Sequence, residues 1–148
     1  MIKEDVKHII RWTLKYLDMY SEDAEELVYR TGMAETGYRH LRQMGNGPAI
    51  GFFQVESATM YDTLKNYVEY RKHLKKSILE LGYNSEEPIM SLMSNIALQV
   101  AFCRLKYRRD KRPIPSKDKI EEQAKYWKRV YNTELGKGTV EHFISCNK

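Results

Sequence analysis

The segment PIMSLMSNIALQVAFCRLKYR, residues 88–108, decides the fold class of this chain. Apolar side chains recur along its whole length, and no charged side chain precedes Arg104. A helix that is apolar on all its faces has to be surrounded by protein. Pro88 favours a helix start, because proline suits the first helical position. We therefore expect one helix over 88–108, buried at the centre of an all-α domain.

Apolar residues at three- and four-residue spacing predict amphipathic helices on both sides of this segment. Ser21 and Ser116 are suited to begin two of them, because a serine hydroxyl accepts a hydrogen bond from the first free backbone N–H groups. Gly82 is suited to end another. About six to eight helices are expected in total, and those outside the central segment lie at 3–19, 21–35, 57–81 with a break, 116–131 and 139–145.

The stretch 36–51 differs in composition from the rest of the chain. It contains four of the eight glycines and also Pro48, which excludes a regular helix. We expect a structured loop there, with room for a minimal β-hairpin. A length of 148 residues with 42% hydrophobic side chains fits one folded domain covering 1–148.

The charge balance is basic, with 25 Lys and Arg against 20 Asp and Glu and a formal net charge of +5. A basic surface suits polyanions, although a modest net charge also serves solubility alone. The densest positive cluster is 104–112. It has two interpretations, a contact with an anionic surface or a solvated helix end followed by a loop.

Several classes of protein do not fit the sequence. The chain has no apolar run long enough to span a bilayer, and residues 1–10 lack the apolar core of a signal peptide. Cys103 and Cys146 lie too far apart for metal-ligand spacing, and the four histidines form no cluster. We expect neither a metal site nor a cofactor nor a disulfide, and we expect Cys103 to be a buried thiol.

Glu35 is the candidate catalytic residue. It stands where a helix is expected to end and the glycine-rich loop to begin, and loops fixed to a rigid scaffold often carry catalytic groups. Partial burial there would raise the pKa of its carboxyl group and make it a proton donor near neutral pH. The alternative is a surface glutamate at a frayed helix end.

The segment Gly51-Phe52-Phe53-Gln54 is the candidate binding segment. It follows the loop at a distance that allows it to fold back beside Glu35. The two aromatic rings would offer stacking faces to a sugar, and the Gln54 amide would offer both a donor and an acceptor. The alternative is a turn in the core.

Four motifs together resemble one known family, and they occur in the family's order. The motifs are Glu35–Gly37, Gly47–Gln54, Asn95-Ile96 followed by Phe102, and Val130–Thr133 followed by Gly136. They resemble those of Slt-type lytic transglycosylases, which are related to goose-type lysozymes. The sequence of residues 47–59 is most similar to that of phage-encoded members. The resemblance implies a lysozyme-like fold.

The resemblance also implies an activity. The substrate would be bacterial peptidoglycan, cleaved at the β-1,4 bond between N-acetylmuramic acid and N-acetylglucosamine. Glu35 would act as acid and then as base, and the product would carry a 1,6-anhydro ring. Tyr131 would hydrogen-bond to Glu35, and Asn132 would tie down a loop beside the substrate. Thr36 stands where the family has Ser. Gln99, Phe102 and Cys103 replace its Gly, Tyr and Leu, which predicts a repacked central helix.

Other functions remain open on the sequence. A hydrolytic lysozyme would need a second carboxylate, for which Glu56 and then Asp62 are the candidates, although Glu56 also suits a helix start near Ser57. A non-enzymatic virion protein and a nucleic-acid-binding protein are further alternatives, and only the cluster 104–112 supports the latter. We expect no nucleic acid partner, no membrane span and a monomer, carried in a phage virion or held in the host cytoplasm before it acts on the cell wall.

Overall fold

The computed structural model describes residues 1–45 and 47–148; position 46, inside the predicted loop 36–51, lies outside the described residues. The described part is mostly helical with one small antiparallel sheet, which confirms the all-α class. The elements follow one another in this order: α1 (Lys3–Tyr16), α2 (Glu22–Glu35), β1 (Ala49–Ile50), β2 (Val55–Glu56), α3 (Ser57–Thr63), the π-helical η1 (Leu64–Val68), α4 (Lys72–Leu81), α5 (Pro88–Ser94), α6 (Ile96–Arg108), α7 (Ile120–Tyr126), the π-helical η2 (Trp127–Asn132) and α8 (Val140–Cys146).

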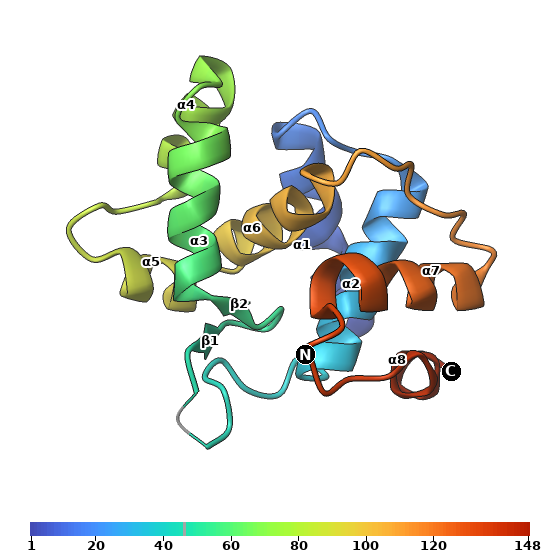
Figure 1. Ribbon diagram of the computed structural model, residues 1–148. Helices are drawn as coiled ribbons and strands as arrows, with labels where there is room; N and C mark the ends of the chain where they lie inside the picture. Colours follow the sequence, from blue (N-terminus) through green and yellow to red (C-terminus); the bar gives the residue numbers. More distant parts are fainter. Residues whose placement is uncertain (46) are drawn as a thin grey trace.

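The helix α6 is the buried centre of the molecule, as predicted. It contacts α1 and α2 on one side, and α3, α4 and α5 on the other, so that it passes through the middle of the fold (Figure 1). Its side chains from Leu98 to Leu105 are all buried. Phe102 and Cys103 belong to this buried set. Cys103 is therefore the buried free thiol that the sequence predicts.

The expected single helix over 88–108 is wrong, because the chain breaks at Asn95. The axes of α5 and α6 differ by 102°. Asn95 has an extended backbone, its side chain accepts a hydrogen bond from the Leu98 N–H, and its amide donates to the Leu81 carbonyl. An asparagine is more favourable as a helix cap than inside a helix. The apolar run therefore forms two helices that are held at a corner.

Three of the four residues predicted to begin or end helices do so, and Ser116 does not. Ser21 caps α2 through the Ala24 N–H, Pro88 is at the first turn of α5, and Gly82 ends α4 in the left-handed conformation with φ +118°. Ser116 does not cap a helix. Its side chain accepts from the Asp118 N–H inside a turn, and α7 begins only at Ile120.

A minimal hairpin is present as β1 and β2, but it lies later than predicted, because β2 falls beyond the stretch 36–51. Ala49 pairs with Glu56 and Ile50 with Val55. The buried Gln99 side chain of α6 connects this hairpin to the corner between α5 and α6. Its Oε1 accepts from the Phe52 N–H at 3.0 Å, and its Nε2 donates to two carbonyls at the end of α5. The repacking expected at this position is therefore a set of hydrogen bonds to backbone groups.

Within the described residues, no single helix is both long and apolar enough to cross a membrane; α5 and α6 meet the length and composition criteria only as a pair, bent by 102°.

Gln99→Met tests the role of this side chain. The change leaves three backbone groups without their partners, and we expect it to lower the free energy of unfolding by about 2–4 kcal/mol. Urea unfolding followed by circular dichroism measures the loss. Gln43→Met is the matched control, because Gln43 accepts one bond, from the Ala49 N–H, in a partly buried setting, and its loss should be smaller. Equal losses in the free energy of unfolding would contradict the conclusion that Gln99 stabilises the fold through three backbone hydrogen bonds.

Candidate active site

Glu35 is the last residue of α2, and its side chain lines a cavity of about 680 Å³. Walls from six other parts of the chain surround it: the loop before β1, the hairpin, α6, η2, the loop before α8 and α8 itself. The lining residues are Ala34, Glu35, Gln43, Ala49, Gln54, Glu56, Lys106, Trp127, Tyr131, Asn132, Thr133, Leu135, Gly136, Lys137, Gly138 and His142. A cavity of this size is typical of small-ligand sites.

Thr36 fixes the end of α2 against the hairpin. Its hydroxyl donates to the Phe52 carbonyl at 2.7 Å and accepts from the Tyr38 N–H at 3.1 Å. The following residue, Gly37, has φ +61°, which turns the chain away from the helix axis. The side chain of Glu35 is therefore held at the rim of the hairpin by a buried hydroxyl group.

Burial raises the pKa of Glu35 to about 7. Desolvation is the main cause, because a carboxylate loses its water when it is partly buried. Three groups act in the opposite direction: Trp127 Nε1, which donates to Glu35 Oε2 at 3.1 Å, and the charges of Lys106 and His142. The result is a carboxyl group that can both release and take up a proton near neutral pH.

Lys106 contributes a second charge to this cavity. Its ammonium donates to the Tyr131 carbonyl at 2.7 Å and lies 4.3 Å from the centre of the Tyr131 ring. Burial lowers the pKa of Lys106, and the negative charge of Glu35 works against that shift. The sequence groups Lys106 with the basic cluster 104–112, but in the structure Lys106 lines the same cavity as Glu35, whereas Arg104 and Arg108 line another.

The expected stacking role of Phe52 and Phe53 is wrong. Their exposed fractions are 8% and 1%, and both rings pack against Tyr38, with ring centres 5.5 and 5.8 Å apart. Gly51 is also buried, and a Cβ at its position would lie 2.7 Å from the Gln99 side chain. The core-turn alternative therefore holds for these three residues. Gln54 does line the cavity, and its amide donates to the Gly51 carbonyl.

The expected hydrogen bond between Tyr131 and Glu35 is replaced by another. The Tyr131 hydroxyl donates to the Phe53 carbonyl at 2.5 Å, so it holds the hairpin turn from the opposite side. Trp127 is the side chain that donates to Glu35. Sequence reasoning missed Trp127, although it lies four residues before Tyr131 and such residues share one face of a helix.

Asn132 lines the cavity, and its contact with the loop before α8 passes through Lys128. Its Oδ1 accepts from Lys128 Nζ at 2.7 Å, and the same ammonium donates to the Gly136 carbonyl. A Cβ at Gly138 would lie 2.5 Å from the Trp127 ring and 2.9 Å from the Asn132 amide. The loop before α8 therefore lies directly on Trp127, and it encloses Glu35 on that side.

Two further carboxylates were candidates for a second acid. Glu56 lines the cavity with Glu35 and is exposed. It occupies the position before α3, yet its side chain makes no capping hydrogen bond. Asp62 pairs with Arg109 at 2.6 Å and does not line this cavity. Glu56 is thus the only second carboxylate among the described lining residues.

No metal centre is indicated for the described residues, since none of their His, Cys, Asp and Glu side chains form a group of three. In comparisons with known proteins, no family model, no curated protein and no solved structure matches this chain.

The raised pKa of Glu35 predicts a pH-dependent effect of Glu35→Gln on stability. The pKa is about 7 in the folded chain and 4.5 ordinarily. Glu35 therefore supports folding fully below pH 4.5, and that support is lost as the pH rises through 7. The neutral amide avoids the loss, so the variant should be more stable than the parent at pH 8, by up to about 3 kcal/mol.

Urea unfolding at pH 4 and pH 8 measures this difference. The gain should vanish at pH 4, where Glu35 is protonated in both states. Glu56→Gln, at an exposed position in the same cavity, is the matched control and should show no such pH dependence. A gain for Glu35→Gln that is the same at both pH values would contradict the raised pKa.

Proposed function

We propose that this chain is a lysozyme-like peptidoglycan lytic transglycosylase that cleaves the β-1,4 bond between N-acetylmuramic acid and N-acetylglucosamine. The observation that carries the proposal is the position of Glu35, a partly buried carboxyl group in the wall of a cavity, where burial raises its pKa to about 7 and so suits it to act as a general acid at neutral pH. The resemblance of the four sequence motifs to Slt-type transglycosylases supplies the reaction class.

The reaction begins with proton transfer from Glu35 to the oxygen of the scissile bond. As that bond breaks, positive charge develops at the sugar carbon, and the N-acetyl group of the substrate itself stabilises it. Glu35 is then a carboxylate, and the Trp127 N–H and the Lys106 charge stabilise that form. It next removes the proton from the 6-hydroxyl of the same sugar, whose oxygen closes the 1,6-anhydro ring. One carboxyl group serves both steps, and no water is consumed.

The cavity offers polar groups for a sugar chain. Gln54, Asn132 and His142 line it beside Glu35, and amides and imidazoles can bond to both hydroxyl and acetamido groups. Lys137 adds an exposed positive charge at the rim. It suits the lactyl carboxylate and peptide acids of peptidoglycan, because long-range attraction concentrates anionic substrates near a basic site.

Hydrolysis is the second candidate function, and one observation favours it. Glu56 lines the same cavity as Glu35, and it is exposed to water. In an inverting glycosidase, such a carboxylate would activate a water molecule on the opposite face of the sugar ring. In the transglycosylase, Glu56 has no chemical step to perform.

Digestion of purified peptidoglycan tests the proposal. Glu35→Gln keeps the size of the side chain and removes its proton, and we expect at least a ~100-fold loss of muropeptide release, within the range for a general acid. Glu56→Gln should retain activity within about threefold. Mass spectrometry of the parent's products should show 1,6-anhydro ends.

The alternatives give different results in the same assay. Reducing ends with added water, together with a large loss for Glu56→Gln, would replace transglycosylation by hydrolysis. If the parent releases no muropeptides, or releases as much as Glu35→Gln does, the enzymatic proposal is wrong.

Trp127→Phe tests whether the Trp127 N–H lowers the pKa of Glu35. The change removes the N–H that bonds to the Glu35 carboxylate and keeps an aromatic ring against Phe143. The pKa of Glu35 should rise further, so the alkaline limb of the rate against pH should move to higher pH. Trp12→Phe, at the exposed second tryptophan, should leave the profile unchanged. A shift to lower pH in Trp127→Phe would contradict the role.

A further inference from the structure

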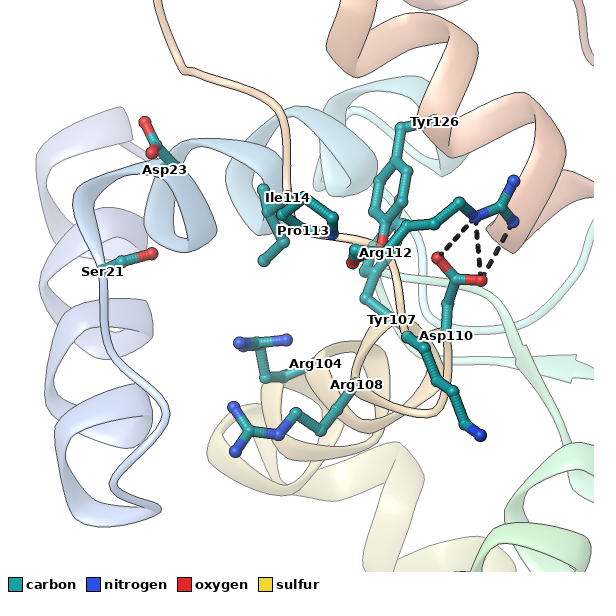
Figure 2. Close-up of a pocket in the computed structure, with 11 residues that line it drawn as sticks. Ser21, Asp23, Arg104, Tyr107, Arg108, Asp110, Arg112, Pro113, Ile114 and Tyr126 are labelled. Carbon is teal, nitrogen blue, oxygen red and sulfur yellow. Dashed lines mark hydrogen bonds and ion pairs between the residues drawn. The ribbon is translucent and has the colours of Figure 1, made fainter.

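A second cavity, of about 480 Å³, lies at the C-terminal end of α6, away from Glu35. Figure 2 shows the Arg104 and Arg108 side chains of α6 extending to the same side, with Pro113 and Ile114 across from them, whereas Arg112 extends away to Asp110. The lining residues are Ser21, Asp23, Arg104, Tyr107, Arg108, Asp110, Lys111, Arg112, Pro113, Ile114 and Tyr126.

The two cavities lie on opposite faces of α6. Arg104 and Arg108 are one helical turn apart and share a face, whereas Lys106 is about 200° around the helix axis from Arg104. Arg104 and Arg108 line the second cavity and Lys106 lines the first. A ligand in the second cavity is therefore independent of the proposed catalytic function.

Arg104 is unusual because its side chain is largely buried without a carboxylate partner, while the two Nη groups remain accessible from the cavity. Its exposed fraction is 6%, and its Nε donates to the Met19 carbonyl at 3.2 Å. No described residue accepts a hydrogen bond from its two Nη groups, which point into the cavity beside Arg108 in Figure 2. Burial and the like charge of Arg108 both lower the pKa of Arg104. Charged groups are rarely buried unless they are paired.

The other charges of this cavity do not compensate Arg104. Asp110 is bound to Arg112, with an N–O distance of 2.9 Å, and these two charges neutralise each other. Asp23 also lines the cavity, but it forms no ion pair with Arg104 or Arg108, and one of its oxygens accepts the Lys117 backbone N–H. Arg108 and Lys111 form no ion pair with any described residue. A surplus of positive charge thus faces the cavity, and it is carried by the N–H donors of Arg104, Arg108 and Lys111.

We propose that this cavity binds the phosphate group of a phosphate monoester. The phosphate lies between the guanidinium groups of Arg104 and Arg108, and the organic part of the ligand lies against Pro113 and Ile114. Guanidinium groups match the geometry of phosphate oxygens through paired N–H donors. A phosphate monoester near neutral pH carries close to two negative charges, which balances the two free arginines. A carboxylate carries one charge and leaves one guanidinium uncompensated.

Calorimetric titration of the full chain at pH 7.5 and constant ionic strength tests the proposal. The probes are phenyl phosphate, inorganic phosphate and benzoate. We expect saturable binding of phenyl phosphate with a stoichiometry of about one, weaker binding of inorganic phosphate and the weakest binding of benzoate. Arg108→Gln, at an exposed position, should weaken phenyl phosphate binding about tenfold or more.

Two further variants complete the experiment. Arg39→Gln removes the same charge from an exposed position outside both cavities and should leave binding unchanged. Arg104→Lys keeps the buried charge but removes the paired donors, and it should weaken phosphate more than benzoate. Thermal unfolding of each variant verifies that it is folded.

The proposal is overturned if phenyl phosphate shows no saturation, if benzoate binds as tightly, or if Arg39→Gln and Arg108→Gln have the same effect. A further arm uses a single-stranded oligonucleotide with no terminal phosphate. If it binds in an Arg108-dependent manner while the small phosphates do not, the cluster recognises a phosphodiester polymer and the monoester site is wrong.

Discussion

The short turn between β1 and β2 is the constraint on which the site depends, because side chains from three separate parts of the chain hold it. Thr36 donates to the Phe52 carbonyl, Gln99 accepts the Phe52 N–H, and Tyr131 donates to the Phe53 carbonyl. Buried backbone groups need such partners, since an unpaired one costs about 1–3 kcal/mol. The same three elements, α2, α6 and η2, also carry the candidate acid and the Lys106 and Trp127 side chains that act on it. Holding the turn therefore holds the cavity.

The electrostatics of the cavity reflect two opposed requirements. An acid must be protonated at the start of its reaction, which burial of Glu35 favours, and its carboxylate must be tolerated afterwards, which Trp127 and Lys106 favour. If burial acted alone, the pKa of Glu35 would be higher still, and its carboxyl group would be a weaker acid. If the positive charge acted alone, Glu35 would lose its proton before the substrate arrived. The pKa of about 7 results from the balance between them.

The parts of this structure that the sequence predicts are those that local chemistry determines. Ser21 and Pro88 act through neighbouring backbone groups, so their roles could be inferred from two or three residues. Asn95 is also a local signal, but the apolar run on both sides favoured an uninterrupted helix over a capped corner. The burial of Phe53 and the bond from Trp127 to the acid depend on which elements meet in space. Helix periodicity predicts which face of a helix a side chain occupies, but not which other element packs against that face.

The cluster 104–112 shows why composition alone could not assign this region. Lysine and arginine are favoured in the last turn of any helix, because they offset the negative end of the helix dipole by about 0.3–1 kcal/mol. That effect accounts for exposed members such as Arg108 and Arg109. It does not account for Arg104, which lies a full turn earlier and whose burial costs several kcal/mol unless a partner compensates it. The Met19 carbonyl satisfies one of its donors. The remaining donors are accessible from the second cavity, where the proposed phosphate would compensate the charge of this arginine.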